Sequence, residues 1–335
     1  MKTLILYVQL ICAWDLICND VWYDIADRVF ACNSGDCTFE DRSSNSSKTP
    51  IIFVSQRNLY EFTTRKPTTP YIIVSANHAD SCAPYGRGTS GGGESLLDDA
   101  NLVAWYATNV AASHKKLHPL PLGPKVQWDT RTFHQEEESK TLLSSVLENQ
   151  DPKKNFFEIE RPNLVDCHMT VHDSDIIQCK VLTAEQSRRS AASHFERFAK
   201  QHESPPNDAC TMKLPDKLRN VTIDANHRAQ ISYFQRLRCA KFVPVPEGAG
   251  LDTHRFYETL TMGAIPIVID FPPMRELFEE LPVLRVQKWS DVTMHLLETS
   301  YKELRNARHK YNWRRLQAEY WREKNLRSAS KLNTQ

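Results

Sequence analysis

The stretch 241–270 constrains the fold more than any other part of the chain. Its sequence is KFVPVPEGAGLDTHRFYETLTMGAIPIVID. The apolar runs 241–245 and 265–270 are typical of buried strands, and HRFYETLTM between them has the pattern of a helix. Gly263 is placed to end that helix. The stretch therefore predicts a strand, a glycine-containing loop, a helix and a second strand, which is the repeating unit of a parallel α/β sheet.

The loop of this unit has the features of an anion site. Gly248 and Gly250 can adopt positive φ, and either Asp252 or Thr253 can cap the helix that follows. Such a loop presents backbone N–H groups to a ligand beside the positive end of the helix dipole. The usual nucleotide-binding glycine patterns are absent, so phosphate binding competes here with a purely structural turn.

Two charged side chains follow the loop on one face of the helix. Arg255 lies in the first turn and offers a bidentate cation to phosphate oxygens. Glu258 lies one turn further on, and a carboxylate there suits two sugar hydroxyls, such as those of ribose. The alternative is an intrahelical salt bridge between the two, which on a surface contributes about 0.3–0.5 kcal/mol.

Strand and helix patterns alternate along most of the chain. We expect strands at 51–55, 71–75 and 162–171, helices at 96–114, 136–149, 187–202, 229–240 and 295–325, and an extended proline-rich segment at 117–128. The alternation predicts an α/β fold with parallel sheets, and its repetition on either side of residue 150 predicts two domains. The last helix is expected to pack across the seam between them.

Composition sets the predicted boundaries. The apolar run Leu4–Trp14 is shorter than the ~20 residues that span a bilayer and has the length of a signal-peptide core, with a buried N-terminal strand as the alternative. The polar, Ser-rich segment 33–50 indicates a linker before structure begins at Ile51. The resulting division is a signal peptide or short anchor at 1–18, a linker at 19–50, domains at 51–150 and 151–294, and a helical segment at 295–335.

Cysteines and glycosylation motifs favour the secretory pathway. The chain has nine cysteines, and cleavage after Ala13 would leave an even set suited to disulfides. Sequons at Asn45 and Asn220 point the same way. The absence of a CxxC pair argues against a finger-type zinc site, and the net charge of +1 gives no reason to expect a nucleic-acid partner.

Over residues 241–292 the sequence resembles the C-terminal domain of exostosin-like glycosyltransferases. The pattern runs K-F, a strand, P-x-G-x-G-x-D-T-H-R, an aromatic residue, E-x-L, G-x-I-P, a strand, and a later L-P-V-L with W-S. A weaker resemblance to the N-terminal half of the same group covers 71–80, 101–110 and 114–123. The stretch FVPVPEGAG departs from relatives, which more often have Cys or Ser and Arg or Gly around the proline.

The resemblance implies two Rossmann-like domains in a GT-B-like arrangement. The nucleotide-sugar donor would bind the C-terminal domain, and a glycan or glycoprotein acceptor would face the N-terminal one. Arg255 maps to the family's phosphate-binding arginine and Glu258 to its ribose-binding or helix glutamate. Relatives place a further arginine near the donor phosphates, a role that Arg188 or Arg189 would fill here. The residues that would line the donor loop are Gly248, Gly250, Asp252, Thr253 and His254.

Sugar transfer also needs a base beside the acceptor hydroxyl. His78 and Asp80 follow the strand 71–75 at its carboxyl end and are the candidates, with a surface-loop role as the alternative. The resemblance implies no metal and no cofactor, although DSD at 173–175 formally fits a metal-binding pattern. The expected function is inverting sugar transfer in the Golgi or secretory lumen, with the N-terminus as a point of membrane association. A catalytically inactive or carbohydrate-binding relative, or an unrelated phosphate-binding module, is the alternative.

Overall fold

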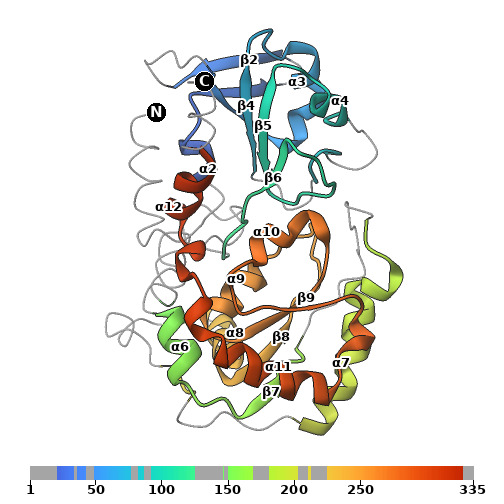
Figure 1. The fold of residues 1–335 in the computed structure, drawn as a ribbon, viewed down its shortest axis with the longest axis vertical. Coiled ribbons are helices and arrows are strands. Elements are labelled where there is room, and N and C mark those ends of the chain that lie inside the picture. Colours follow the sequence, from blue (N-terminus) through green and yellow to red (C-terminus); the bar gives the residue numbers. More distant parts are fainter. Residues whose placement is uncertain are drawn as a thin grey trace.

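The computed structural model describes residues 21–33, 36–42, 49–76, 82–86, 92–124, 146, 150–168, 181–202, 210–212 and 225–326. Within them the chain forms two sheets, of six and four strands, whose pairs are mostly parallel (Figure 1). The α/β class expected from the sequence is confirmed. Among these residues, no helix combines the length and the apolar character that crossing a bilayer requires.

The first sheet has the strand order β2-β1-β3-β4-β5-β6. Its strands are β1 Arg28–Asn33, β2 Asp36–Asp41, β3 Ile51–Val54, β4 Tyr71–Ser75, β5 Leu102–Ala107 and β6 Leu117–Pro119. The β1–β2 pair is antiparallel, and the other pairs are parallel. Every residue of β4 is buried, as in a central strand covered on both faces. The strands predicted at 51–55 and 71–75 are confirmed.

The sheet begins earlier in the chain than expected. β1 and β2 form a hairpin that a Cys32–Cys37 disulfide joins, and β1 pairs with β3. The prediction that ordered structure begins at Ile51 is therefore wrong. The polar composition of residues 33–50 suggested a linker. It is misleading because β2 is an edge strand whose outward residues are polar, while Cys37 on its other face is buried.

The helix predicted at 96–114 is also wrong. Only the short α4 (Glu94–Leu97) is helical there, and β5 follows it with all but one residue buried. A strand buried on both faces has a continuous apolar run rather than an alternating one. Ala104 and Trp105 therefore matched helical spacing by coincidence, and the indole of Trp105 donates a hydrogen bond to Ser75 Oγ on β4 at 2.7 Å.

The second sheet has the order β10-β9-β8-β7, with all three pairs parallel. Its strands are β7 Asn163–Val165, β8 Ala240–Pro244, β9 Ile265–Ile269 and β10 Leu284–Val286. The helices of this part of the chain are α6 Pro152–Glu158, α7 Arg188–His202, α8 Ala225–Cys239, α9 His254–Thr261 and α10 Arg275–Phe278. The predicted unit of strand, loop, helix and strand at 241–270 is confirmed, as are the helices at 187–202 and 229–240.

The C-terminal segment is not one long helix. α11 (Met294–Asn306) ends at Ala307, and short turns at Arg308–Lys310 and Trp313–Leu316 precede α12 (Ala318–Trp321). Figure 1 shows this segment running from the second sheet to α2 (Val21–Asp24), at the other end of the described chain. Trp22 and Trp321 belong to the same buried core cluster, so both described ends of the chain contribute to it.

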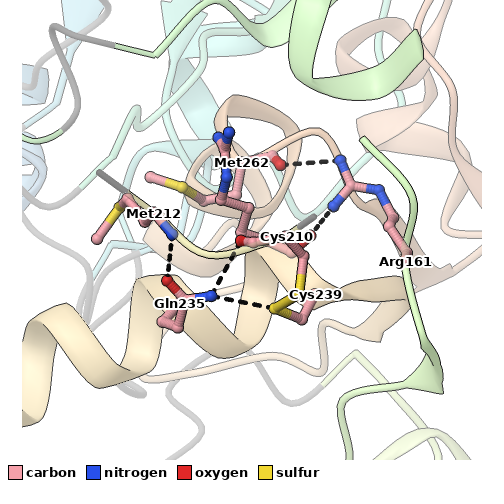
Figure 2. Close-up of a disulfide and its surroundings, with 7 residues drawn as sticks. Arg161, Cys210, Met212, Gln235, Cys239 and Met262 are labelled. Atoms are coloured by element: carbon pink, nitrogen blue, oxygen red, sulfur yellow. Dashed lines mark hydrogen bonds between the residues drawn. A yellow bond between two sulfur atoms is a disulfide. The ribbon is translucent and has the colours of Figure 1, made fainter. Parts of the chain in front are cut away.

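A buried arginine and a disulfide fix the ends of α6, α8 and α9. The Arg161 guanidinium donates to the carbonyls of Asn155 at 2.7 Å, Met262 at 3.1 Å and Arg238. Figure 2 shows the bond to Met262. The Cys210–Cys239 disulfide ties the end of α8 to a preceding segment, and the Gln235 side chain bonds to both halves of it. These contacts hold the strand and helix that carry the glycine loop.

Gly263 is required at the end of α9 for two reasons. Its φ is +77°, and a Cβ there would lie 2.5 Å from Arg161 and from the backbone of Asn155. The helix stop predicted for this glycine is confirmed.

Candidate functional site

The glycine loop lies between β8 and α9, at the carboxyl end of the second sheet. Thr253 is the N-cap of α9 by its extended backbone, but its side chain makes no capping bond. Gly248 and Gly250 do not adopt positive φ, because the described glycines that do are Gly86, Gly92, Gly123 and Gly263. The Gly248 N–H instead donates to the Gly250 carbonyl at 2.9 Å, so the turn closes within the ordinary φ range.

A small pocket opens beside this loop, above the carboxyl ends of β8 and β9. Its free volume is about 40 Å³, room for one or two waters. The lining is mostly apolar, with Glu247, Asp252 and Thr253 as its polar members. The Thr253 hydroxyl is buried and makes no hydrogen bond within the described residues. The Thr253 hydroxyl is therefore a polar group that the loop can offer to a ligand in this mostly apolar pocket.

Arg255 points from the first turn of α9 toward β7. Its Nε donates to the Pro244 carbonyl at 3.1 Å, and one terminal nitrogen lies 3.2 Å from Asp166 Oδ2. A guanidinium has five N–H donors, and these two bonds engage two of them. The predicted intrahelical pair of Arg255 with Glu258 is replaced by this longer-range pair with Asp166. The side chain is 18% exposed, so it still reaches the surface.

Glu258 is buried beneath this arginine. Its carboxylate accepts a hydrogen bond from the Tyr233 hydroxyl at 2.7 Å, and the Tyr233 ring lies 5.6 Å from the Arg255 guanidinium. Burial raises the pKa of Tyr233 well above its usual value, which keeps the hydroxyl a donor. Ribose binding by Glu258 stays a prediction.

Arg188 lies on the other side of the loop, at the start of α7. Its backbone N–H donates to Glu247 Oε1 and its Nε to the Glu247 carbonyl, each at 2.8 Å. A Cβ on Gly248 would lie 3.4 Å from the Arg188 guanidinium. Arg188 thus lies beside the glycine loop and Arg189 is exposed, and a phosphate-binding role for either stays a prediction.

Asp252 and His254 join the glycine loop to the first sheet. The Asp252 N–H donates to Asn109 Oδ1 at 2.8 Å, and its carboxylate accepts from Leu122 N at 2.7 Å. His254 Nδ1 lies 2.7 Å from the Gly123 carbonyl. Asn109 follows β5 and Leu122 follows β6, so loops at the carboxyl ends of both sheets meet at this point. Two residues expected to line a donor site therefore also hold the two sheets together.

The Asp252 carboxyl is fully buried and accepts a hydrogen bond from the Tyr257 hydroxyl at 2.6 Å. Burial raises the pKa of Asp252 to about 7, against the lowering effect of its hydrogen bonds. This joint is therefore sensitive to pH near neutrality.

Several predicted residues lie outside the described part of the chain. They are the candidate bases His78 and Asp80, the acidic segment 173–175, the sequons at Asn45 and Asn220, and the N-terminal apolar run. The roles assigned to them stay predictions. Within the described residues, no group of three or more His, Cys, Asp or Glu side chains could hold a metal ion.

Sequence reasoning missed the residues that surround Arg255. Asp166 follows β7, and its side chain is 4% exposed. Arg236 and Tyr233 come from α8, three residues apart on one face. The strand expected at 162–171 ends at Val165 in the structure, so Asp166 stands at a strand end, whereas the sequence pattern places it inside the strand. The contribution of α8 depends on how that helix packs, which its sequence does not specify.

The chain matches no protein-family model, and a comparison with curated proteins finds no similar sequence. The resemblance to exostosin-like glycosyltransferases therefore rests on the residues quoted above.

Proposed function

We propose that the protein is a glycosyltransferase that moves a sugar from a nucleotide-sugar donor to a glycan or glycoprotein acceptor. The main support for the proposal is that loops following the carboxyl ends of strands in the two sheets contact one another. Asp252 after β8 is hydrogen-bonded both to Asn109 after β5 and to Leu122 after β6. Ligands of open α/β sheets bind at carboxyl ends, so a donor on one sheet would lie beside an acceptor on the other.

The donor side is supported by charge as well as position. Arg188 and Arg255 flank the glycine loop, and the N-terminus of α9 adds the positive end of a helix dipole. A leaving diphosphate gains charge in the transition state, and fixed donors of this kind stabilise it. No metal is required for that role.

The architecture that this proposal implies is a pair of Rossmann-like domains in a GT-B-like arrangement. Two mostly parallel sheets with facing carboxyl-end loops favour it. A doubly wound sheet also reverses its strand order. From β3 to β6 and from β7 to β10, the described strands instead follow one another in chain order. The donor site is therefore assigned by loop chemistry and not by such a reversal.

His78 or Asp80 is proposed as the base, because both come soon after β4 in the sequence and ligands of parallel sheets bind beyond the carboxyl ends of strands. The two disulfides Cys32–Cys37 and Cys210–Cys239 favour an oxidising compartment, in keeping with the secretory pathway or Golgi lumen.

A non-catalytic relative that binds a nucleotide or a carbohydrate is the second candidate. It is favoured by the engagement of Asp252 and His254 in the joint between the sheets, which leaves Thr253 and Arg255 as the loop's side chains for a ligand. Such a protein would bind donor nucleotides without transferring or hydrolysing their sugars.

The test is a thermal-shift panel of UDP, GDP and CMP with their sugar conjugates, on the wild type and on Arg255→Ala. A nucleotide present at a hundred times its Kd should add about 2.7 kcal/mol to the free energy of unfolding. We expect one nucleotide to raise the Tm of the wild type and to have no effect on the variant. A shift that persists in Arg255→Ala would remove this arginine from the site, and no shift with any nucleotide would contradict the function.

A further inference from the structure

The carboxyl end of β7 carries a group of charged side chains beside the glycine loop. We call it the Asp166 cluster, and its members are Asp166, His168, Tyr233, Arg236 and Arg255. They come from three separate elements: the residues after β7, helix α8 and helix α9. In the proposed function only Arg255 has a role.

Asp166 is the centre of this cluster. Its backbone N–H donates to the Phe242 carbonyl on β8 at 3.0 Å, so the sheet fixes its position. Its Oδ1 lies 2.9 Å from His168 Nδ1 and 3.7 Å from Arg236 Nε. Its Oδ2 lies 3.2 Å from Arg255. One carboxylate thus holds three basic side chains.

Burial separates the charges of the cluster. The side chain of Asp166 is 4% exposed, whereas those of Arg255, Arg236 and His168 are 18%, 36% and 52% exposed. The Glu258 carboxylate is likewise buried below the Tyr233 ring. The carboxylates are therefore buried and the basic side chains are nearer the solvent, where their N–H groups can bind an anion.

Arg236 is held less tightly than Arg255. Its guanidinium lies 6.0 Å from the Tyr233 ring, on which Arg255 also rests at 5.6 Å. At 3.7 Å from Asp166 its Nε is beyond hydrogen-bond distance, and it makes no hydrogen bond within the described residues. An arginine kept in place mainly by charge and by a ring face can turn its donors to a ligand at little cost.

We propose that Arg236 is a further diphosphate-binding cation, beyond Arg188 and Arg255, and that Asp166 is the residue that positions Arg236 and Arg255 for it. The ligand is the diphosphate of a nucleoside diphosphate, so the inference rests on the proposed function. A diphosphate carries more charge than one guanidinium neutralises, and two arginines beside one carboxylate present neighbouring N–H donors to it.

The experiment measures the Kd of UDP and GDP, and of uridine and guanosine, by calorimetry. The variants are Arg236→Ala, Arg236→Lys, Asp166→Asn and Arg255→Ala, with Arg308→Ala as the control. Arg308 is an exposed arginine that contacts Phe157 on α6. Loss of one charge-assisted contact should weaken diphosphate binding on the order of 10- to 100-fold in Arg236→Ala. Nucleoside binding should not change, Arg236→Lys should recover part of the loss, and Arg308→Ala should match the wild type.

Asp166→Asn should weaken diphosphate binding at least as much, because it releases both arginines. If this variant does not fold, Arg236→Ala decides the question. A loss in Arg255→Ala without one in Arg236→Ala would overturn this inference and leave the proposed function standing. Equal losses of nucleoside and diphosphate affinity would reduce Arg236 to a structural role. If the wild type binds neither diphosphate, both proposals fail.

Discussion

The two sheets are built from the same parallel unit but are secured differently. The first ends in an antiparallel hairpin whose disulfide joins residues five apart, so this bond is local to one edge. In the second, the disulfide spans 29 residues and fixes the end of α8, directly before the central strand β8. The charged groups of the candidate site gather on the second sheet. Of the two disulfides whose cysteines are both described, the one with the longer span thus lies in the part that carries these charged groups.

The largest loss of stability is expected from replacing two tightly packed glycines. Gly93 lies in the part of the chain that forms the first sheet, and Gly263 in the part that forms the second. Gly263→Ala places a Cβ against Arg161 and the Asn155 backbone at positive φ, and should cost roughly 3–5 kcal/mol. Gly93→Ala places a Cβ 2.3 Å from the Pro84 carbonyl at ordinary φ, and should cost about 1–3 kcal/mol. Urea unfolding measures both.

Gly248→Ala is the matched control. A Cβ there meets nothing closer than 3.4 Å, and the backbone is in the ordinary φ range, so stability should stay within about 1 kcal/mol of the wild type. An equal cost at Gly248 and Gly263 would mean that the glycine loop is as tightly packed as the end of α9, against the geometry described here.

The disulfides should differ in the stability that they contribute. From loop length alone, replacing Cys210 and Cys239 by alanine should cost roughly 3.6 kcal/mol, and replacing Cys32 and Cys37 roughly 2 kcal/mol. Denaturant unfolding of the two double variants gives the comparison. If the hairpin bond proved the more costly to lose, the edge of the first sheet would be more important to folding than its position indicates.

A pH dependence is also expected at the joint between the sheets. Burial raises the pKa of Asp252 to about 7, above the ordinary value of 3.8 that the unfolded chain has. Between these values the native state binds the extra proton, so stability falls as pH rises from about 4 to 7. The slope from this group approaches about 1.4 kcal/mol per pH unit. Asp252→Asn should remove that slope, as measured by urea unfolding from pH 5 to 8.

Asp270 is the control for this titration, because a hydrogen bond from Arg275 lowers its pKa below the usual value. Its contribution is lost only at lower pH, so Asp270→Asn should give a curve parallel to the wild type between pH 5 and 8. A slope that survives in Asp252→Asn would assign the pH dependence to another group.

The sequence predicted the second sheet better than the first. At 241–270 the strands, glycine stop and helix each have a distinct local signal, and all of them were found. In the first sheet, β5 was predicted as part of a helix. Its sequence LVAWYA is buried on both faces, so it has no alternation of polar and apolar residues to distinguish it from a helix. The β1–β2 hairpin was not predicted, because the edge strand β2 is as polar in composition as a linker.

The candidate site was predictable only where its residues are contiguous. The loop residues and Arg255 were identified from one stretch, and Arg188 from the resemblance. The partner of Arg255 was not, since Asp166 lies 89 positions away and meets it only when β7 is placed beside β8. The use of Asp252 and His254 between the sheets could not be foreseen either, because it depends on loops that follow strands of the other sheet.

The joint at Asp252 also determines how this protein can be handled in the laboratory. Residues of both sheets, with Trp22 from one described end and Trp321 from the other, share one buried cluster. Cutting the chain near residue 150 to express each half alone would expose this apolar surface and leave the Asp252 carboxyl without Leu122. Either half would therefore be prone to aggregate, and the two halves should be produced as one chain or co-expressed.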